Sequence, residues 1–527
     1  MRQRTNLCED GQGCDIIDAD LVVLRCSVAI SRLSNMGTGK ALLCVLGGVF
    51  LSGVLLFPVP AARGSSTFPD VVVAPAPLTE APTPAIALDS NGYPVFATAS
   101  NGLYSMVLLR CNDTDCAGAD ETRTTLESLS YPDYFSGRPA LALGTSGNPV
   151  VAYFRSLSFA THELRVLHCG SADCTSGNTI ATPATIPTSP VLGDPSMVLD
   201  GSGNPVIGYT SGTTAQLLHC NDQGCLDGDD GAVTLSTNAQ SPALVLDGAG
   251  NPVVSFRWYY EELRVLHCGD PNCSGGNTLT SPGTAPAYGS DIRLDSNGNP
   301  VISYRSGTSL GILRCNDPNC DGGDDMTAVP FAEAIPSWLT SLALDPSGNA
   351  VVALFSGGKH MAQLVRCGDA ACSSGNAVVY IGSSYWHPSL TFDNSGQEVI
   401  AYASGNANLL TLVRCGVPHC STDTDGDSCT DVMERATGGG SEKGGGLRDA
   451  KNPHDYFNPT KDGQNRVDDV LAVVGKYFID VSDPPSYSTQ YDRTYLGPNP
   501  WNLGPPNGQI RIDDVLNAIG QYFHDCP

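Results

Sequence analysis

The chain has 527 residues, of which only 16% are charged, and its formal net charge is −26 at pH 7. Phosphate binding needs clustered Lys and Arg, so this acidity argues against a nucleic-acid partner and fits an extracellular, calcium-binding protein. The 58 glycines and 37 prolines indicate a turn-rich, mainly β chain.

The N-terminal segment has the pattern of a secretory leader. Lys40 precedes an apolar run, residues 41–57, which is followed by Val59-Pro60-Ala61-Ala62. We expect residues 36–62 to be a signal peptide that starts at Met36, and residues 1–35 to be a mis-called leader. The alternative is an uncleaved membrane anchor, for which the run is close to the lower limit of about 17 residues. Both interpretations place the rest of the chain outside the cell.

Residues 69–420 contain one unit repeated seven times. Each unit has an apolar run that usually ends in Leu-Asp, a turn, two further apolar runs, a basic residue and C-x4-C. Successive first cysteines lie 58, 51, 48, 47, 52 and 48 residues apart. A period near 50 indicates an array of equal units, none of which can bury its own core alone.

Four strands can be placed in each unit. In the fourth unit they are Ala243–Asp247, Val253–Trp258, Leu263–Cys268 and Asn277–Thr280. Seven units of four antiparallel strands predict a seven-bladed β-propeller, so the fold class is mainly β. The seventh unit lacks a fourth strand after Cys420, whereas Asp70–Ala74 reads as a strand without a partner. A ring must cover its open sheet edges, so we predict that Asp70–Ala74 completes blade seven.

Fourteen of the twenty cysteines lie in the repeated pairs. Zinc sites usually combine two pairs with shorter spacing, so a disulfide in each unit is the better interpretation and indicates an oxidising compartment. The predicted bonds are Cys111–Cys116, Cys169–Cys174, Cys220–Cys225, Cys268–Cys273, Cys315–Cys320, Cys367–Cys372 and Cys415–Cys420. A further bond, Cys429–Cys526, would close the C-terminal region, which leaves Cys8, Cys14, Cys26 and Cys44 unpaired in the leader.

The residue before each first cysteine is basic. These residues are Arg110, His168, His219, His267, Arg314, Arg366 and Arg414. Strands one and three of a blade run in the same direction, so each base should lie roughly 10 Å from the Asp that ends strand one. Those Asp residues are Asp89, Asp200, Asp247, Asp295, Asp345 and Asp393, with Gly144 in unit two. We expect a repeated ion pair or turn clamp rather than a ring of ligands.

Aromatic residues gather in the later units. Tyr288, Trp338 and Trp386 share one position in units five to seven, and Trp258, Tyr259 and Tyr260 lie in a loop of unit four. They could stack on sugars or on a partner protein, or fill the gaps between blades. Glu261 and Glu262 are the one non-repeated acidic pair that could serve an enzyme.

After the last blade, residues 421–451 form an Asp- and Gly-rich linker. Asp423, Asp425, Asp427 and Asp431 place carboxylates around a tight turn, which suits Ca²⁺. The run resembles thrombospondin type 3 repeats.

Residues 452–527 contain a second duplication. Asp468-Asp469-Val470-Leu471 recurs 45 residues later as Asp513-Asp514-Val515-Leu516 and begins an apolar helical pattern in both copies. Each helix follows a glycine, like the loop-helix half of an EF-hand. The pair resembles a type I dockerin, which implies a small α-helical domain, Ca²⁺ as cofactor and a cohesin-like or scaffold partner.

The resemblance implies ligands in both loops. In the first loop they are Asn458, Thr460, Asp462, Gln464 and Asp469. In the second, Leu503 and Pro505 occupy the first two positions and leave Asn507 and Asp514, so weaker binding is expected there. Val467-Asp468 and Ile512-Asp513 stand where the family has its cohesin-contacting Ser/Thr pair.

These features favour a secreted, calcium-stabilised, non-catalytic propeller that binds a glycan or a surface protein and attaches through its tail. The alternatives are a propeller glycoside hydrolase or lyase in polysaccharide catabolism, and a structural component of the cell envelope.

Overall fold

The computed structural model describes residues 71–73, 83–100, 102–116, 120–157, 161–186, 193–226, 230–259, 262–282, 287–331, 339–356, 360–384, 386–404, 409–415, Cys420, 423–427, 429–434, Arg448, 451–461, 465–496 and 502–522. The predicted leader and signal segment lie outside these residues. Across the described ranges, none of the helices is long and apolar enough to cross a bilayer.

Seven four-stranded antiparallel sheets form the main body of the molecule, as predicted. Blades one and two are β2 (Ala85–Leu88), β3 (Pro94–Ser100), β4 (Ser105–Arg110), β5 (Thr122–Ser128) and β6 (Tyr134–Leu143), β7 (Pro149–Leu157), β8 (Thr161–His168), β9 (Thr179–Ile186). Blades three and four are β10 (Ser196–Leu199), β11 (Pro205–Ser211), β12 (Thr214–His219), β13 (Ala232–Thr237) and β14 (Ala239–Leu246), β15 (Pro252–Trp258), β16 (Glu262–His267), β17 (Thr278–Thr280). Blades five and six are β18 (Ala287–Leu294), β19 (Pro300–Ser306), β20 (Ser309–Arg314), β21 (Met326–Phe331) and β22 (Ser341–Leu344), β23 (Ala350–Ser356), β24 (Met361–Arg366), β25 (Ala377–Ser383).

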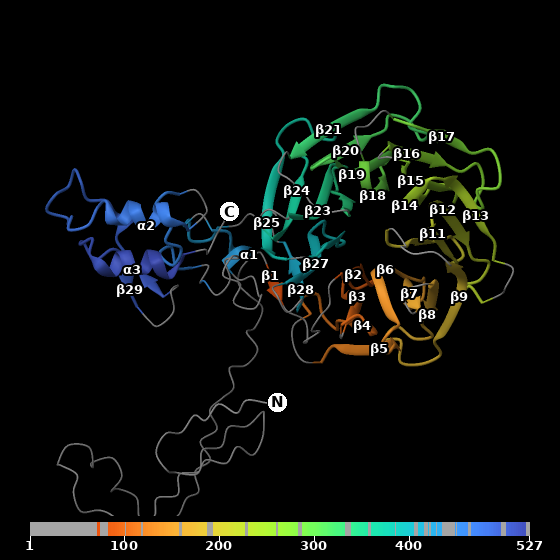
Figure 1. Cartoon of the computed structure of the whole chain (residues 1–527), viewed down its shortest axis with the longest axis horizontal. Coiled ribbons are helices and arrows are strands. Elements are labelled where there is room, and N and C mark those ends of the chain that lie inside the picture. The colour runs from red at the N-terminus through yellow and green to blue at the C-terminus, as the bar shows by residue number, and fades with distance from the viewer. Residues whose placement is uncertain are drawn as a thin grey trace, which may run out of the picture. The chain divides into compact units, whose positions relative to one another are not determined.

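Blade seven joins the two ends of the ring. It consists of β26 (Ser389–Phe392), β27 (Glu398–Ser404), β28 (Leu409–Arg414) and, as its outermost strand, β1 (Val71–Val73). Val71 pairs with Arg414 and Val73 with Leu412, in antiparallel register. The predicted closure by residues 70–74 is therefore confirmed, and β1 lies beside β28 in Figure 1.

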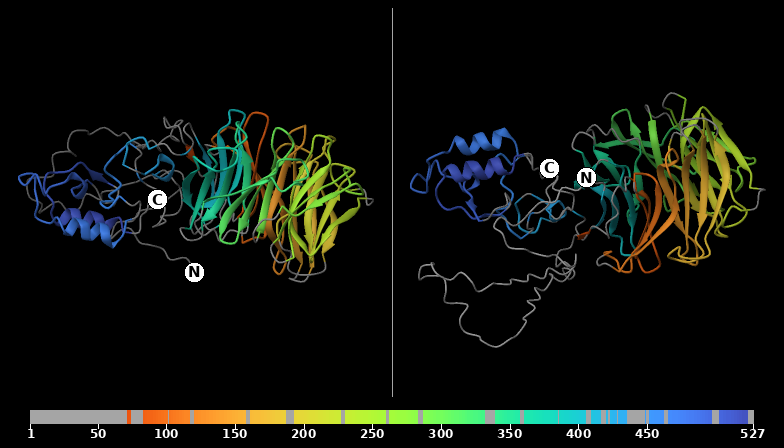
Figure 2. Two further views of the ribbon diagram at one scale, coloured as in Figure 1. Left: turned by 90° about the horizontal axis from the view of Figure 1, so that it is seen from above. Right: turned by 60° about the horizontal axis from the view of Figure 1, so that its bottom comes forward.

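The blades are arranged in a ring (Figure 1), and the strands run across its thickness (Figure 2). The first strand of each blade, or the residues just before it, lines a single cavity of about 360 Å³ on the axis. The buried side chains form clusters that each combine two neighbouring blades; Phe96 of blade one, for example, packs with Val399 and Leu412 of blade seven. Each unit thus buries its apolar faces only against its neighbours, as the repeat period predicts.

Aspartate side chains close the first hairpin of most blades. Oδ1 of Asp247 accepts hydrogen bonds from the backbone N–H groups of Ala249 and Asn251, at 2.8 Å each. Gly250 has a φ of +86°, which glycine adopts without steric penalty. The same contacts recur at Asp89, Asp200, Asp295, Asp345 and Asp393. In blade two the turn keeps its backbone hydrogen bond from Gly144 to Asn148, at 2.9 Å.

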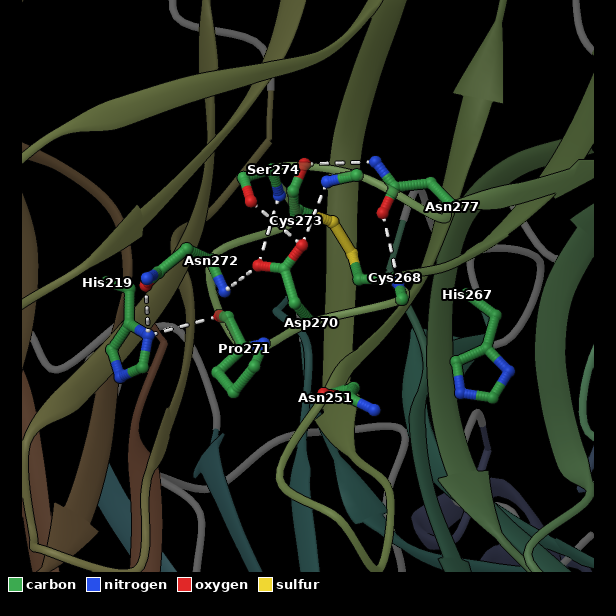
Figure 3. The surroundings of a disulfide bond; sticks show 12 residues. His219, Asn251, His267, Cys268, Asp270, Pro271, Asn272, Cys273, Ser274 and Asn277 are labelled. Atoms are coloured by element: carbon green, nitrogen blue, oxygen red, sulfur yellow. Dashed lines mark hydrogen bonds between the residues drawn. A yellow bond between two sulfur atoms is a disulfide. The ribbon is translucent and has the colours of Figure 1, made fainter.

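All seven predicted C-x4-C disulfides are present. The second cysteine of each pair has a positive φ between 50° and 55°. Figure 3 shows the cysteine loop of blade four, in which Asp270 accepts hydrogen bonds from the backbone N–H groups of Asn272 and Ser274 beside the Cys268–Cys273 bond. Cys429 is also disulfide-bonded. Its predicted partner Cys526 lies outside the described residues, so that pairing stays a prediction.

The basic residue before the first cysteine clamps its own blade. In five blades it contacts the Asp of the first turn, as the sequence indicates. The pairs are Arg110–Asp89 at 2.6 Å, His219–Asp200 at 3.1 Å, His267–Asp247 at 3.0 Å, Arg314–Asp295 at 3.2 Å, and Arg414–Asp393. In blade six, Arg366 instead pairs at 2.7 Å with Glu398, the first residue of β27 in blade seven.

The same basic side chains also reach the cysteine loop of the next blade, which the sequence did not reveal. Figure 3 shows Nδ1 of His219, from blade three, beside Pro271 and Asn272 of the blade-four loop. The other contacts are Arg110 to the carbonyl of Ala172, His267 to Asn319, Arg314 to the carbonyl of Ala370, and Arg414 to the carbonyl of Thr114. These residues therefore join neighbouring blades and are not arranged as a ligand site.

The C-terminal region contains short helices. They are α1 (Asp431–Glu434), α2 (Val467–Val474), η1 (Thr489–Tyr491) and α3 (Ile512–Gly520), with a two-stranded hairpin of β29 (Thr494–Tyr495) and β30 (Leu503–Gly504). Helices α2 and α3 lie side by side (Figures 1 and 2). Their core includes Phe457, Val473, Leu503, Ile510 and Val515.

Candidate functional site

A group of carboxylates lies directly after the propeller. Asp423, Asp425 and Asp427 each place one carboxylate oxygen within 4.8 Å of the others. Gly426, between them, has a φ of +78°, so the chain turns sharply enough to bring alternate side chains together. Three of the four carboxylates that the sequence analysis assigned to this turn therefore lie together, and their binding of Ca²⁺ stays a prediction.

A second group extends the first. Glu434, at the end of α1, and Asp455 place carboxylate oxygens within the same 4.8 Å limit of Asp427. Both are almost fully buried, at 0% and 1% exposure. We call Asp423, Asp425, Asp427, Glu434 and Asp455 together the carboxylate cage.

The sequence analysis missed Glu434 and Asp455. Glu434 is the twelfth residue counted from Asp423, and a glutamate at position twelve is the last ligand of an EF-hand loop, so this spacing could have identified it. Asp455 comes from a segment 21 residues further on, and no local pattern connects it to the run.

The electrostatics of the cage favour a cation. Burial, followed by the charge of Asp427, raises the pKa of Asp425 to about 7. Burial, reinforced by Asp427 and Asp455, raises the pKa of Glu434 to about 10. Neither carboxylate oxygen of Glu434 has a hydrogen-bond partner within the described residues. Among the described residues, Arg448 opposes the shifts of Asp427 and Glu434, and Arg493 also interacts with Asp427. Two positive charges do not balance five carboxylates.

Asp431 serves a different local role from the cage residues. Its carboxylate accepts hydrogen bonds from the backbone N–H and the hydroxyl of Thr424, at 2.7 and 2.6 Å. It is fully buried and holds the start of the loop against α1.

The first EF-like loop brings three of its predicted ligands together. Asp469 accepts hydrogen bonds from the backbone N–H and hydroxyl of Thr460, at 3.0 and 2.9 Å. The Thr460 hydroxyl also lies 3.2 Å from the amide oxygen of Asn458. Asp462 and Gln464 lie outside the described residues. Asp469 is 1% exposed and also caps α2 through the backbone N–H of Arg466.

The second loop is built differently from the sequence prediction. Asp492, which the sequence analysis did not consider, is fully buried and accepts hydrogen bonds from the N–H groups of Asn507 and Gly508, at 3.0 and 2.8 Å. Asp514 caps α3 and accepts from the N–H of Arg493. Leu503 instead belongs to the core. The hairpin β29–β30 is thus inserted between Asp492 and Asn507, which accounts for the long 45-residue spacing.

The repeat of Asn458-Pro-Thr460 as Asp492-Arg-Thr494 was the signal that could have revealed this insertion. Aligned this way, Asp492 takes the place of Asn458, and Asn507 that of Asp462. Burial raises the pKa of Asp514 to about 6, and the charge of Asp492 adds to this.

Helices α2 and α3 each expose a stripe of apolar side chains. On α2 and the turn after it, Val467, Leu471, Val474 and Phe478 are 46–72% exposed. On α3, Ile512, Leu516 and Ile519 occupy the equivalent positions and are 50–57% exposed. Spacings of four and three residues place each set on one helical face. The apolar residues of α2 and the turn after it therefore form two sets. Val470, Val473 and Tyr477 face the core, whereas the stripe of Val467, Leu471, Val474 and Phe478 is exposed.

The aromatic residues of the propeller occupy the face opposite the cysteine loops. Tyr288 lies at the start of β18, and the guanidinium groups of Arg257 and Arg305 lie over its ring, with their Cζ atoms 5.3 and 5.1 Å from the ring centroid. Trp258 carries Arg264 over its ring at 3.6 Å. Tyr259 and Trp386 are 55% and 42% exposed. Trp338 and Tyr260 lie outside the described residues.

Glu262 and two aspartates of the axial cavity lie next to arginines. Glu262 lies 3.2 Å from Arg264, and Glu261 is outside the described residues. In the axial cavity, Arg138 lies 3.7 Å from Asp194, and Arg293 lies 2.8 Å from Asp291.

Comparison with known proteins gives structural likeness only. No protein-family model and no curated protein sequence matches the chain. Among solved structures, it is similar to a protein of unknown function from Dyadobacter fermentans (13% identity, TM-score 0.40, 59% of this chain and 96% of that one). It is also similar to the polysaccharide lyase Uly1 (10%, 0.42, 64% and 90%) and to a PL25 ulvan lyase (11%, 0.42, 66% and 96%). At these scores, the fold assignment rests on the seven sheets themselves.

Proposed function

We propose that the chain is a secreted, non-catalytic binding protein whose propeller carries the ligand and whose C-terminal region attaches it to a scaffold or surface. The observation that carries this proposal is the pair of equivalent apolar stripes on α2 and α3. Soluble proteins rarely leave repeated large apolar side chains in contact with water unless a partner covers them. The seven disulfides fit the oxidising environment outside the cell.

Calcium is part of this proposal. Ca²⁺ takes six to eight oxygen ligands, and the carboxylate cage offers five carboxylates on one turn, one short helix and one loop. A bound ion would supply the positive charge that the cage lacks. Because Val432 and Met433 of α1 pack into the core of blade six, the ion would fix the chain at the exit of the propeller.

Attachment is tested with the secreted full chain against a panel of cohesin domains and against isolated cell-envelope material. The double variant Leu471→Asp/Leu516→Asp should lose binding by about tenfold or more, since a charge in each stripe would have to be desolvated. Each single variant should lose less, because the stripes are equivalent. Asp483→Asn, an exposed change elsewhere in the tail, is the matched control. Equal binding by the double variant and the wild type would contradict the proposal.

A further inference from the structure

We infer that the aromatic face of blades four and five is a binding site for an anionic polysaccharide, with carboxylate or sulfate groups held by Arg257, Arg264 and Arg305. This rests on the proposed binding role of the propeller and names the class of ligand.

The site is built from equivalent positions of two blades. Arg257 pairs with Gln240 across β14 and β15, and Arg305 pairs with Tyr288 across β18 and β19. Tyr288 therefore stands at the boundary between the blades, with one arginine from each side over its ring. Both guanidinium groups are therefore carried by strands of the ring, β15 and β19, and lie over the same tyrosine.

Further contacts orient the arginines. Arg257 donates to the amide oxygen of Gln240, and Nε of Arg305 donates to the carbonyl oxygen of Gly307 at 2.6 Å. Arg264 lies over Trp258 and donates to Glu262. A guanidinium that stacks through its face keeps its N–H donors in its own plane, where they match the oxygens of a carboxylate or a sulfate.

The aromatic rings complete the recognition of a sugar. Trp258 and Tyr259 lie next to each other, with ring centroids 5.5 Å apart, and Tyr259 is 55% exposed. Flat aromatic faces pack against the apolar faces of sugar rings, and the arginines beside them would bind the charged substituents. Neutral sugars would use only half of this arrangement.

The charge of the molecule narrows the class further. The net charge of −26 opposes long, densely charged polymers such as nucleic acids, which need basic residues along an extended track. Arg257 and Arg305 share the Tyr288 ring on the blade-five side of the blade-four sheet, whereas Arg264 lies over Trp258 on the blade-three side. Two such short clusters suit a few sugar units rather than a long backbone.

The test measures retention of the secreted full chain in gels that contain alginate, dextran sulfate or neutral dextran, with single-stranded DNA as a fourth arm. Wild-type protein should be retarded by one or both anionic polysaccharides and much less by dextran. Retention by alginate alone would identify carboxylates as the charged groups, and retention by dextran sulfate alone would identify sulfates. Retention should weaken with added salt.

Variants assign the binding to this site. Arg257→Gln/Arg305→Gln should weaken retention by about tenfold or more, because the two charged donors are lost. Arg305→Lys should give an intermediate loss, since lysine keeps the charge but not the planar stack. Arg123→Gln, on the exposed outer strand β5, is the matched control. The unfolding midpoint of each variant shows that the ring is intact.

Three results would overturn the inference: no retention by either anionic polysaccharide, equal retention by neutral dextran or DNA, or unchanged retention of the double variant. Release of new sugar ends during the assay would support the site but contradict the non-catalytic function. Failure of the tail to bind a scaffold would leave the retention result unaffected, so the two proposals can fail separately.

Discussion

Arg414 is the residue on which the two ends of the ring meet. Its guanidinium pairs with Asp393 of its own blade and donates to the carbonyl oxygens of Gly92 and Thr114 in blade one. It is 7% exposed, so these contacts are made largely out of water. The sequence predicted the pair with Asp393 from strand direction. It could not predict the contact with blade one, because that depends on how close neighbouring blades pack.

Replacement of Arg414 by Gln should destabilise the propeller by about 3 kcal/mol, since it leaves a largely buried aspartate without its cation. Thermal unfolding followed by circular dichroism measures this. The exposed change Arg123→Gln should shift the midpoint little, and an equal midpoint for both variants would show that Arg414 does not hold the ring closed.

Acid should weaken the histidine clamps of blades three and four. Burial tends to raise the pKa of Asp200 and Asp247, but hydrogen bonds from His219, His267 and nearby backbone N–H groups outweigh it and lower both values below 3.8. A carboxylate with a lowered folded pKa stabilises the fold above its unfolded pKa, and this is lost as pH falls through the folded value. Stability from these groups should be constant from pH 7 to 5 and decline below about pH 4.

The double variant His219→Leu/His267→Leu tests this at the level of the residues, since it removes the side-chain hydrogen bonds that lower both pKa values. Its stability should decline less steeply below pH 4 than that of the wild type. Parallel curves for the two proteins would show that other carboxylates govern the acid transition.

At the scale of elements, the repeated units were predictable and the second tail loop was not. A strand bounded by Asp-x-x-Gly and C-x4-C carries its own turn signals, and seven copies reinforce one another. In the tail, by contrast, the β29–β30 hairpin separates Asp492 from Asn507 by fifteen positions. A register counted back from Asp514 therefore placed Leu503 and Pro505 where Asp492 and Thr494 belong. The helix pattern was similarly ambiguous, because apolar residues occur on both the buried and the exposed faces of α2.

Asp492 should be essential to the second loop. It is fully buried and accepts hydrogen bonds from two backbone N–H groups and from the hydroxyl of Tyr487 at 2.7 Å. Asp492→Ala should cost on the order of 3 kcal/mol, since hydrogen bonds to charged groups contribute about 1.5–3 kcal/mol each. Amide hydrogen exchange at Asn507 and Gly508 should accelerate. Unchanged exchange there, or equal acceleration in Asp483→Asn, would contradict this structure of the loop.

At the scale of the whole molecule, stability is divided between two kinds of device. The propeller is held by inter-blade packing, seven disulfides and the basic clamps. The segment after it has little core of its own and concentrates five carboxylates. The sequence analysis expected this division from the run of aspartates after the last blade and from the repeated cysteine pairs, although Asp455 could be assigned to the cage only from the folded chain.

Chelation of calcium should therefore loosen the exit segment and leave the propeller folded. Without a cation, Asp425, Asp427 and Glu434 must either take up protons or move into water, because burial raises the pKa of each carboxyl group, so α1 should loosen. Hydrogen exchange with calcium or with excess chelator should show faster exchange in residues 423–434 and 451–461. Within the propeller, the change should be confined to β25, against which α1 packs.

Glu434→Gln should reproduce part of this effect in the presence of calcium and weaken calcium binding by at least about tenfold in calorimetry, because it lowers the charge of the ligand set. Asp483→Asn should do neither. Loss of exchange protection throughout the blades on chelation would mean that the ion supports the ring itself. A calorimetric titration that shows no heat of calcium binding would mean that the cage does not bind calcium.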